Sequence, residues 1–273
     1  MLNNSKLCKL KDIIRNYQKV VVAYSGGVDS TFLLNVCVDV LGSKSIIAVT
    51  AVSDSYTMDE LKYARSISKM LKVEHIILRT DEMSDPDFIN NTPQRCYHCK
   101  KHLFSKLKDI AGIRNIKHII DASNIDDKSD YRPGRKAAKD FSVGSPLVEA
   151  GLTKNDIREY SKAFGLNSWN KPANPCLASR IPYGSKITKE KLKKVGKAEV
   201  FLKKEGLKIV RLRHHGDLAR IEVSEKEIGK LMKKGRRRRI FKYLRGLGFN
   251  WVTLDLEGYR AGSLNEILPA EFV

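Results

Sequence analysis

The first half of the chain alternates short, uninterrupted apolar runs with longer segments of mixed polarity. Runs rich in β-branched residues are typical of strands buried in a parallel sheet, and the longer segments have the length of helices. One of these segments opens with the pattern of a capping box, Thr57 with Glu60. Another has Thr153 and Asp156 at its start and Gly165 at its end. The expected strands are 19–24, 45–52, 73–78 and 118–121, and the expected helices are 31–41, 57–71, 100–111 and 153–164. This alternation predicts an α/β fold in which helices cover both faces of a parallel sheet.

The pattern changes near Tyr183. Residues 170–184 hold three prolines and no periodicity, which indicates a loop or linker. The remaining runs predict helices at 188–205, 224–234 and 236–247 and strands at 207–214, 218–223 and 251–256, with a hairpin between the first two strands. We therefore predict two domains, a larger α/β domain over residues 1–183 and a smaller α+β domain over residues 184–273.

The charge of the chain is strongly basic. Its 273 residues include 51 Lys and Arg against 31 Asp and Glu, a net charge of +20. Residues 181–273 hold 23 of the basic and 11 of the acidic side chains, so this third carries +12 of the +20. Such a surplus favours polyanionic partners such as nucleic acids, nucleotides or acidic metabolites, although a generally basic proteome would also produce it.

Composition also narrows the expected location. The chain contains no apolar run of about 18 residues, and its first residues lack the apolar core of a secretory signal. Five cysteines are an odd and small number for a disulfide scaffold. We therefore expect a cytoplasmic protein with no membrane partner, whose cysteines serve metal or redox chemistry.

A glycine-containing hexapeptide, SGGVDS at residues 25–30, follows the first expected strand and opens a helix. The glycines allow a tight turn and a close approach of the backbone to a ligand, and N–H groups at a helix N-terminus bind anions. The spacing differs from both GxxxxGK[ST] and GxGxxG. In this context SGGVDS resembles the pyrophosphate loop of the PP-loop ATPases, which cleave ATP to AMP and pyrophosphate. The plain alternative is an ordinary glycine turn.

This resemblance implies an adenine nucleotide α-hydrolase-like domain and assigns roles within it. Pyrophosphate would be held by Ser25, Gly26, Gly27 and Ser30. Adenine would lie against the second strand at residues 48–51, which includes Ala51. Asp29 would place a carboxylate next to the negatively charged phosphates, which requires a cation such as Mg²⁺ between them.

Three cysteines form a second candidate site. Cys96 and Cys99 make a CxxC pair just before an expected helix, and Cys176 lies 77 positions beyond Cys99 in NPCLASR. The pair alone could be structural zinc, a redox pair or incidental. A zinc site needs a fourth ligand, for which His98 is available, whereas Cys37 is expected in the core.

Six segments together resemble the LarE-type ATP-dependent sulfur transferases of nickel-pincer nucleotide biosynthesis. They are SGGVDS (25–30), RCYHCK (95–100), DASNIDDKSDYRPGRKA (121–137), NPCLASR (174–180), RLRHHGDLARIE (211–222) and LDLEGYRAGSLNE (254–266). The resemblance implies that both carboxylates of pyridinium-3,5-biscarboxylic acid mononucleotide are adenylated and converted to thiocarboxylates. It also implies a homo-oligomer, a hexamer in this family, and a separate sulfide donor.

Members of this family differ in the source of sulfur. In one type a single cysteine, at the position of Cys176, gives up its own sulfur. In the other, three cysteines hold a [4Fe-4S] cluster whose open iron carries sulfide. The presence of Cys96, Cys99 and Cys176 favours the cluster as cofactor, beside ATP and Mg²⁺, and makes a sacrificial Cys176 the alternative.

The remaining candidate residues follow from position. Asn124, Asp130 and Arg132 follow the fourth strand, where ligands bind in parallel sheets, so we expect them to face ATP. Arg211 and Arg213 alternate along a strand and share one face, which suits the substrate phosphate with help from Ser179. A solvated strand face is their alternative. Cys176, Arg180 and Glu199 are the candidate catalytic residues, with a surface carboxylate as the alternative for Glu199.

Two other functions compete with this interpretation. A tRNA thiolase also joins a PP-loop to cysteines and would explain the charge, but such enzymes typically have lysine where this chain has Val28, and no RNA-binding appendage is recognisable. A non-catalytic AMP-binding regulatory protein would not need an intact SGGVDS with Asp29. We therefore expect an enzyme that has a pyridinium mononucleotide as its substrate and no nucleic acid partner.

Overall fold

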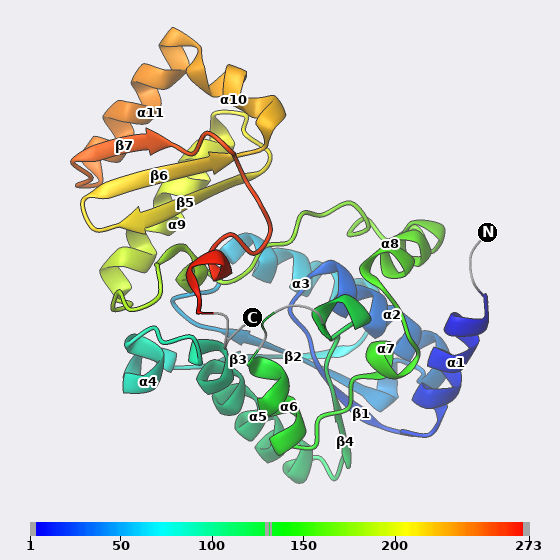
Figure 1. The fold of residues 1–273 in the computed structure, drawn as a ribbon. Helices are drawn as coiled ribbons and strands as arrows, with labels where there is room; N and C mark the ends of the chain where they lie inside the picture. Colours follow the sequence, from blue (N-terminus) through cyan, green and yellow to red (C-terminus); the bar gives the residue numbers. More distant parts are fainter. Residues whose placement is uncertain (1–3, 129–130, 132, 270–273) are drawn as a thin grey trace. The chain divides into compact units, whose positions relative to one another are not determined.

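The computed structural model describes residues 4–128, 131 and 133–269, which form two compact units (Figure 1). Unit 1 comprises Met1–Glu82 and Cys96–Asn174, and unit 2 comprises Met83–Arg95 and Pro175–Val273. The chain therefore passes between the units at 82/83, 95/96 and 174/175, whereas the sequence predicts a single boundary at 183/184. Residues 83–95 belong to unit 2 because Asn91 Nδ2 donates to the carbonyls of Ile181, Pro182 and Ser185.

Unit 1 is built on a parallel four-stranded sheet in the order β3-β2-β1-β4. The strands are β1 (Val20–Ala23), β2 (Ile46–Val52), β3 (Glu74–Arg79) and β4 (His118–Ile120). Side chains alternate between two cores, as in β1, where Val20 and Val22 enter one core and Val21 the other. The predicted α/β parallel sheet is thus confirmed, and its strands lie where the apolar runs place them.

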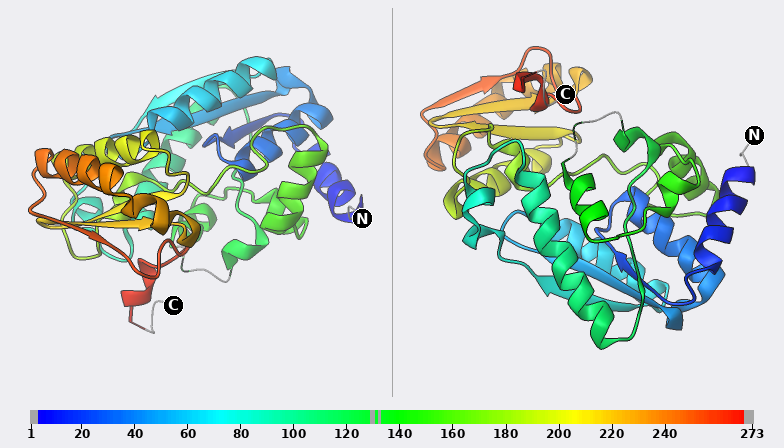
Figure 2. Two further views of the ribbon diagram at one scale, coloured as in Figure 1. Left: turned by 90° about the horizontal axis from the view of Figure 1, so that it is seen from above. Right: turned by 60° about the horizontal axis from the view of Figure 1, so that its bottom comes forward.

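Helices cover both faces of this sheet (Figure 2). One face packs against α1 (Asn4–Arg15), α2 (Val28–Leu41), α3 (Met58–Met70), α7 (Pro146–Glu149) and α8 (Lys154–Ala163). The other packs against α5 (Arg95–Ile113) and α6 (Gly134–Asp140). The sequence did not reveal α1, α6 or α7.

A capping box opens α8 but not α3. Thr153 and Asp156, expected at the start of α8, form a capping box there. Thr57 is the N-cap of α3 as predicted but makes no side-chain capping bond, so the capping box predicted there is wrong. The reason is tertiary, because Thr57 Oγ1 and the Glu60 carboxylate instead accept hydrogen bonds from Asn174 Nδ2 at 3.2 and 3.4 Å.

Unit 2 is a three-stranded sheet with helices. Its strands β5 (Val210–His215), β6 (Leu218–Val223) and β7 (Trp251–Leu254) lie in the order β5-β6-β7. The β5–β6 pair is antiparallel, which confirms the predicted hairpin, and β7 adds to β6 in parallel. The helices are α4 (Pro86–Ile89), α9 (Lys189–Lys204), α10 (Glu225–Met232) and α11 (Lys234–Gly246).

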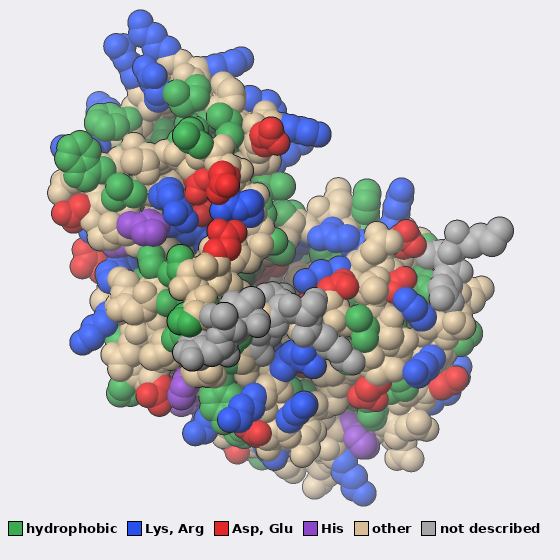
Figure 3. Space-filling model, in the orientation of Figure 1, with side chains coloured by type: hydrophobic (Ala, Val, Ile, Leu, Met, Phe, Trp, Pro, Cys, Tyr) green, Lys and Arg blue, Asp and Glu red, His purple; other side chains and the backbone are tan. Residues whose placement is uncertain are grey.

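Basic side chains gather over the part of unit 2 that α10 and α11 occupy (Figure 3). Arg239 of α11 makes two hydrogen bonds to Glu205, at 3.0 and 2.7 Å. Across the described ranges, every helix is too short or too polar to cross a bilayer.

Candidate active site

The SGGVDS segment forms the connection between β1 and α2, with Gly27 as the helix N-cap. Gly26 has φ +72°, and a Cβ there would come within 3.1 Å of Ala64 Cβ and of the Glu60 carbonyl oxygen. Gly26 is therefore required both by conformation and by close packing. Ser25 Oγ lies 3.1 Å from Ser30 Oγ, so the two hydroxyls come together at the mouth of the loop. The sequence-predicted loop residues are thus grouped at the N-terminus of α2, which is an anion-binding geometry.

Asp29 in the first turn of α2 meets the segment that follows β4. Asn124 Nδ2 donates to Asp29 Oδ2 at 3.0 Å, and Asn124 N donates to Asp127 Oδ2 at 3.1 Å. Burial, and then the nearby Asp127 carboxylate, raise the pKa of Asp29 to about 6. Asn124 is fully buried, and its Oδ1 has no hydrogen-bond partner among the described residues. The predicted approach of Asn124 to the loop is present, whereas Asp130 and Arg132 lie outside the described residues.

The strand expected to face adenine is β2, and Ala51 lies at its carboxyl end. Its side chain is partly buried. The carboxyl ends of parallel strands are where nucleotides bind in open α/β sheets.

The cysteines divide between the two units. Cys96 and Cys99 lie in the first turns of α5 in unit 1, so the expectation that the pair precedes its helix is wrong. The helix starts at Arg95 and not at residue 100 as expected. The Arg95 N–H donates to the Thr92 carbonyl at 2.9 Å, which closes a turn directly before the helix. Cys99 Sγ donates to Glu82 Oε1 at 3.6 Å.

Cys176 belongs to unit 2, is exposed, and precedes the short helix Leu177–Arg180. All five cysteines are free thiols, and Cys37 lies fully buried in α2 as the sequence predicts. Burial raises the pKa of the Cys37 thiol. Within the described ranges, no three His, Cys, Asp or Glu side chains are grouped as a metal site.

Arg180 is fully buried and organises the segment that carries Cys176. Its Nε and Nη2 donate to the two carboxylate oxygens of Glu199 on α9, at 2.8 and 3.0 Å. Its Nη1 donates to the carbonyls of Pro175 and Cys176 at 2.8 and 3.3 Å and to Ser179 Oγ at 2.8 Å. The two sequence-predicted residues Arg180 and Glu199 are therefore brought together, and they fix this loop.

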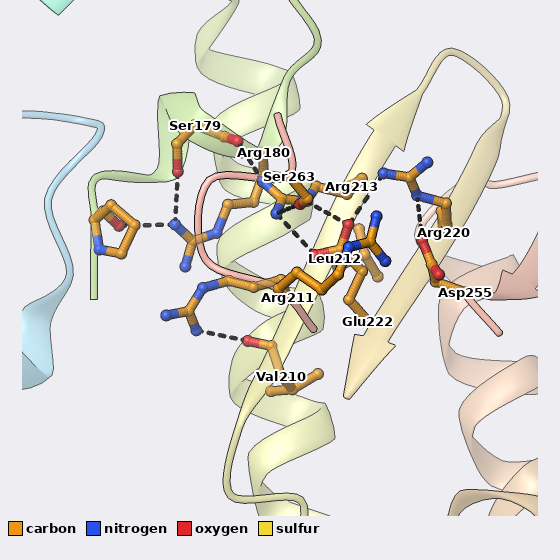
Figure 4. A network of polar contacts seen from close by, with 12 residues as sticks. Ser179, Arg180, Val210, Arg211, Leu212, Arg213, Arg220, Glu222, Asp255 and Ser263 are labelled. Carbon is orange, nitrogen blue, oxygen red and sulfur yellow. Dashed lines mark hydrogen bonds and ion pairs between the residues drawn. The ribbon is translucent and has the colours of Figure 1, made fainter. Parts of the chain in front are cut away.

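Arg213 holds the same segment from β5 (Figure 4). It makes two bonds to Glu222 on β6, at 2.8 and 2.7 Å, and donates to the Ser179 carbonyl at 2.8 Å. Ser263 Oγ accepts a further bond at 3.0 Å. Glu222 and Ser263 did not stand out in the sequence. The hairpin register contains a signal for Glu222, because it lies directly opposite Arg211 on the paired strand.

Arg211 has a different environment from Arg213. It is buried and donates to the Val210 carbonyl at 2.8 Å (Figure 4). Its guanidinium carbon lies over the Tyr259 ring, 5.1 Å from the ring centre. Burial, and then the nearby Arg180 guanidinium, lower the pKa of Arg211. An anion placed beside Arg211 would favour its charged form and so oppose both the burial and the repulsion by Arg180.

A parallel sheet whose first strand leads through SGGVDS into a helix N-terminus defines the PP-loop class of ATP-using proteins. A sequence profile of the family described as NAD synthase matches residues 6–94, which contain this loop. A pyridinium-3,5-bisthiocarboxylic acid mononucleotide synthase of Lactiplantibacillus plantarum is 38% identical over 264 residues, covering 97% of this chain and 95% of the relative. The chain belongs to the family of that synthase, which confirms the resemblance found in the sequence.

Two further relatives extend the family. An uncharacterized protein of Synechocystis is 41% identical over 97% of this chain and 98% of its own length. An uncharacterized protein of Methanocaldococcus jannaschii is 30% identical over 94% of this chain and 98% of its own length. All three relatives match both units, so the family relation includes unit 2.

Proposed function

We propose that this chain is an ATP-dependent sulfur transferase that makes pyridinium-3,5-bisthiocarboxylic acid mononucleotide for the nickel-pincer cofactor. The observation that carries this proposal is the SGGVDS loop with Asp29 bound to Asn124, in a chain 38% identical to a synthase of that product. The substrate is the corresponding biscarboxylic acid mononucleotide.

The chemistry is activation followed by substitution at each carboxylate. A carboxylate oxygen attacks the α-phosphorus of ATP, and pyrophosphate leaves into the loop formed by Ser25, Gly26, Gly27 and Ser30. Sulfide then attacks the acyl carbon, and AMP leaves with the former carboxylate oxygen. The loop supports the first step because backbone N–H groups and the helix N-terminus stabilise the charge that develops on pyrophosphate. We place adenine against β2 at Ala51 and assign Asp130 and Arg132 to the same nucleotide.

Magnesium fits the oxygen groups beside the loop. Asp29 is a carboxylate close to a second carboxylate, and the buried Asn124 Oδ1 has no hydrogen-bond partner among the described residues. Hard oxygen donors of this kind suit Mg²⁺, which would supply charge neutralisation for the phosphates. We assign Asp29 as its principal protein ligand.

The donor set also suits an iron–sulfur cluster. Cys96, Cys99 and Cys176 are not joined in disulfides, and none of them is fully buried as Cys37 is. We propose that these three thiolates hold a [4Fe-4S] cluster, which would supply an iron able to carry sulfide.

In unit 2 we assign the substrate phosphate to Arg211 and Arg213, with Ser179 beside them. Arg211 is the stronger candidate, because a phosphate would offset the cost of burying its guanidinium charge. The guanidinium of Arg213 is paired with Glu222. Because Arg180 and Glu199 are committed to each other and to the Cys176 loop, we assign them a positioning role in catalysis.

The setting of the reaction follows from its reagents. A sulfide donor must deliver sulfur to the thiol site, and free thiols persist in reducing compartments, which supports the cytoplasm. We also propose a homo-oligomer, as the family resemblance implies.

The products of ATP cleavage test the proposal. The full chain with ATP, Mg²⁺ and the pyridinium biscarboxylate should release AMP and pyrophosphate only when the pyridinium compound is present, and Asp29→Asn should abolish this. Lys6→Met, which removes an ion pair with Asp156 away from the loop, is the control. Formation of ADP and phosphate would contradict the proposal.

A further inference from the structure

Three successive carbonyl groups at the start of the SGGVDS loop accept hydrogen bonds from side chains outside the loop. Thr50 Oγ1 donates to the Tyr24 carbonyl at 2.7 Å, the Tyr56 hydroxyl to the Ser25 carbonyl at 2.8 Å, and Lys171 Nζ to the Gly26 carbonyl at 3.2 Å. We name Thr50, Tyr56 and Lys171 the carbonyl clamp.

The clamp determines where the loop N–H groups point. In a trans peptide, the carbonyl of one residue is directed opposite to the N–H of the next. With the carbonyls of residues 24–26 held by the clamp, the planes of these peptides are fixed, and so are the directions of the N–H groups of residues 25–27; the Gly27 N–H donates to Ser25 Oγ at 3.4 Å. N–H groups of fixed direction are what an anion-binding loop needs.

Gly26 is the point at which this arrangement most needs support. Its φ of +72° is open to glycine, but glycine also has the greatest backbone freedom, so the peptide that follows it can rotate. A hydrogen bond from a charged donor is stronger than one from a neutral donor, so a charged donor holds such a carbonyl best. Lys171 supplies that donor.

Lys171 is itself held in place. Its Nζ lies 2.8 Å from Glu60 Oε2 and 3.9 Å from the centre of the Tyr63 ring. The Lys171 and Glu60 side chains are only 24% and 13% exposed, so water screens their pairing weakly. Asn174 bonds Thr57 and Glu60, so segment 171–174 is fastened to the start of α3.

We propose that Lys171 is a positioning residue for the pyrophosphate loop, which it serves by holding the Gly26 carbonyl while paired with Glu60. This role rests on the proposed use of ATP and adds a residue that lies far from SGGVDS in the sequence. The competing hypothesis is that Lys171 contacts a phosphate of ATP directly. Substitution of Glu60 distinguishes the two hypotheses. If Lys171 acts on the loop, loss of Glu60 charge releases Lys171 and weakens ATP binding. If Lys171 acts on phosphate, the same change removes a competing anion and strengthens binding.

Calorimetric titration of the full chain with Mg·ATP tests the role. Lys171→Met keeps the length of the side chain and removes its donors, so ATP should bind about tenfold more weakly or worse. Lys171→Arg keeps charge and donors and should restore most of the affinity. Glu60→Gln should weaken binding in the same direction as Lys171→Met. Lys6→Met breaks an ion pair with Asp156 of similar exposure in unit 1 and should leave ATP affinity unchanged.

Amide hydrogen exchange of residues 25–30 without nucleotide supplies a second readout. Lys171→Met and Glu60→Gln should speed exchange in this segment, and Lys6→Met should not. Tighter ATP binding by Glu60→Gln, or unchanged exchange in Lys171→Met, would overturn the positioning role. If the wild-type chain bound no ATP, the proposed function would fail, and the exchange data would still decide whether Lys171 orders the loop.

Discussion

Arg180 and Glu199 form a two-point ion pair in the interior of unit 2, and the same guanidinium holds the carbonyls of Pro175 and Cys176. The two side chains are 0% and 4% exposed. Glu199 Oε1 also accepts the Leu212 N–H of the edge strand β5 at 3.0 Å. One buried pair therefore joins helix α9, strand β5 and the loop that carries Cys176.

Removing one partner of this pair should be costly. Glu199→Gln leaves the buried Arg180 without its counter-charge, so we expect the free energy of unfolding to fall by about 3–5 kcal/mol in urea titrations. Arg239→Ala is the control, because it breaks a two-point pair with Glu205 from an Arg239 side chain that is 59% exposed. Its cost should be much smaller, because water screens an exposed ion pair. Equal effects of the two variants would contradict a role for burial.

Arg211 and Arg213 should respond differently to loss of charge. Arg211→Met removes the cation that we assign to the substrate phosphate, so the KM for the pyridinium substrate should rise. The lost contact to phosphate corresponds to about 1.5–3 kcal/mol. Arg213→Met removes the two-point partner of buried Glu222 and should lower the melting temperature. An unchanged KM for Arg211→Met, measured at saturating ATP, would refute its assignment to the phosphate.

The cysteine assignment is tested by metal content. Anaerobically reconstituted protein should hold iron and labile sulfide, and Cys96→Ser, Cys99→Ser and Cys176→Ser should each lose them. Cys8→Ser is the control, since Cys8 is an exposed free thiol in α1. With ATP, substrate and sulfide, the wild-type chain should turn over repeatedly. Conversion of Cys176 to dehydroalanine after one transfer, seen by mass spectrometry, would instead show a sacrificial cysteine. Bound zinc without labile sulfide would also contradict the cluster.

Local signals in the sequence predicted the strands of both units and most of the longer helices. The strands of unit 1 are uninterrupted apolar runs, and parallel strands buried on both faces require that pattern. SGGVDS is likewise a contiguous signal, so the sequence predicts the loop and its helix together. The short helices α4, α6 and α7 were not predicted, because tertiary packing decides the conformation of such short segments. Helix α1 was not predicted either, although Leu7, Leu10, Ile13 and Ile14 give it an apolar face.

Long-range polar pairs could not be predicted in the same way. Thr57 and Glu60 have the spacing of a capping box, but Asn174, more than 100 positions later, takes both acceptors. The same holds for Arg213. The alternation of Arg211 and Arg213 places both on one face of a strand, but it does not predict that Arg213 pairs with Glu222. The sequence therefore indicates most of the charged residues of the site, but it does not predict which of them form ion pairs with one another.

Stability should depend on pH through His75, a half-buried histidine whose ring lies between two hydroxyl groups. Its Nε2 lies 2.8 Å from Thr50 Oγ1, and its Nδ1 lies 2.8 Å from Ser68 Oγ. Both hydroxyls also donate to backbone carbonyls at 2.7 Å, Thr50 to that of Tyr24 and Ser68 to that of Ala64. Burial, and then the nearby Arg65, lower the pKa of His75 from its usual 6.5.

The sign of the effect follows from proton binding. Just below pH 6.5 the unfolded chain binds a proton at His75 that the folded chain does not, so acid favours unfolding. The contribution of neutral His75 is therefore fully present above this pH and is lost as the pH falls toward the lowered folded pKa. In His75→Gln the side chain no longer titrates, so the stability advantage of the wild type should shrink between about pH 7 and pH 5. Urea unfolding of both proteins across this range measures it, and a difference that stays constant with pH would show that His75 is not held neutral.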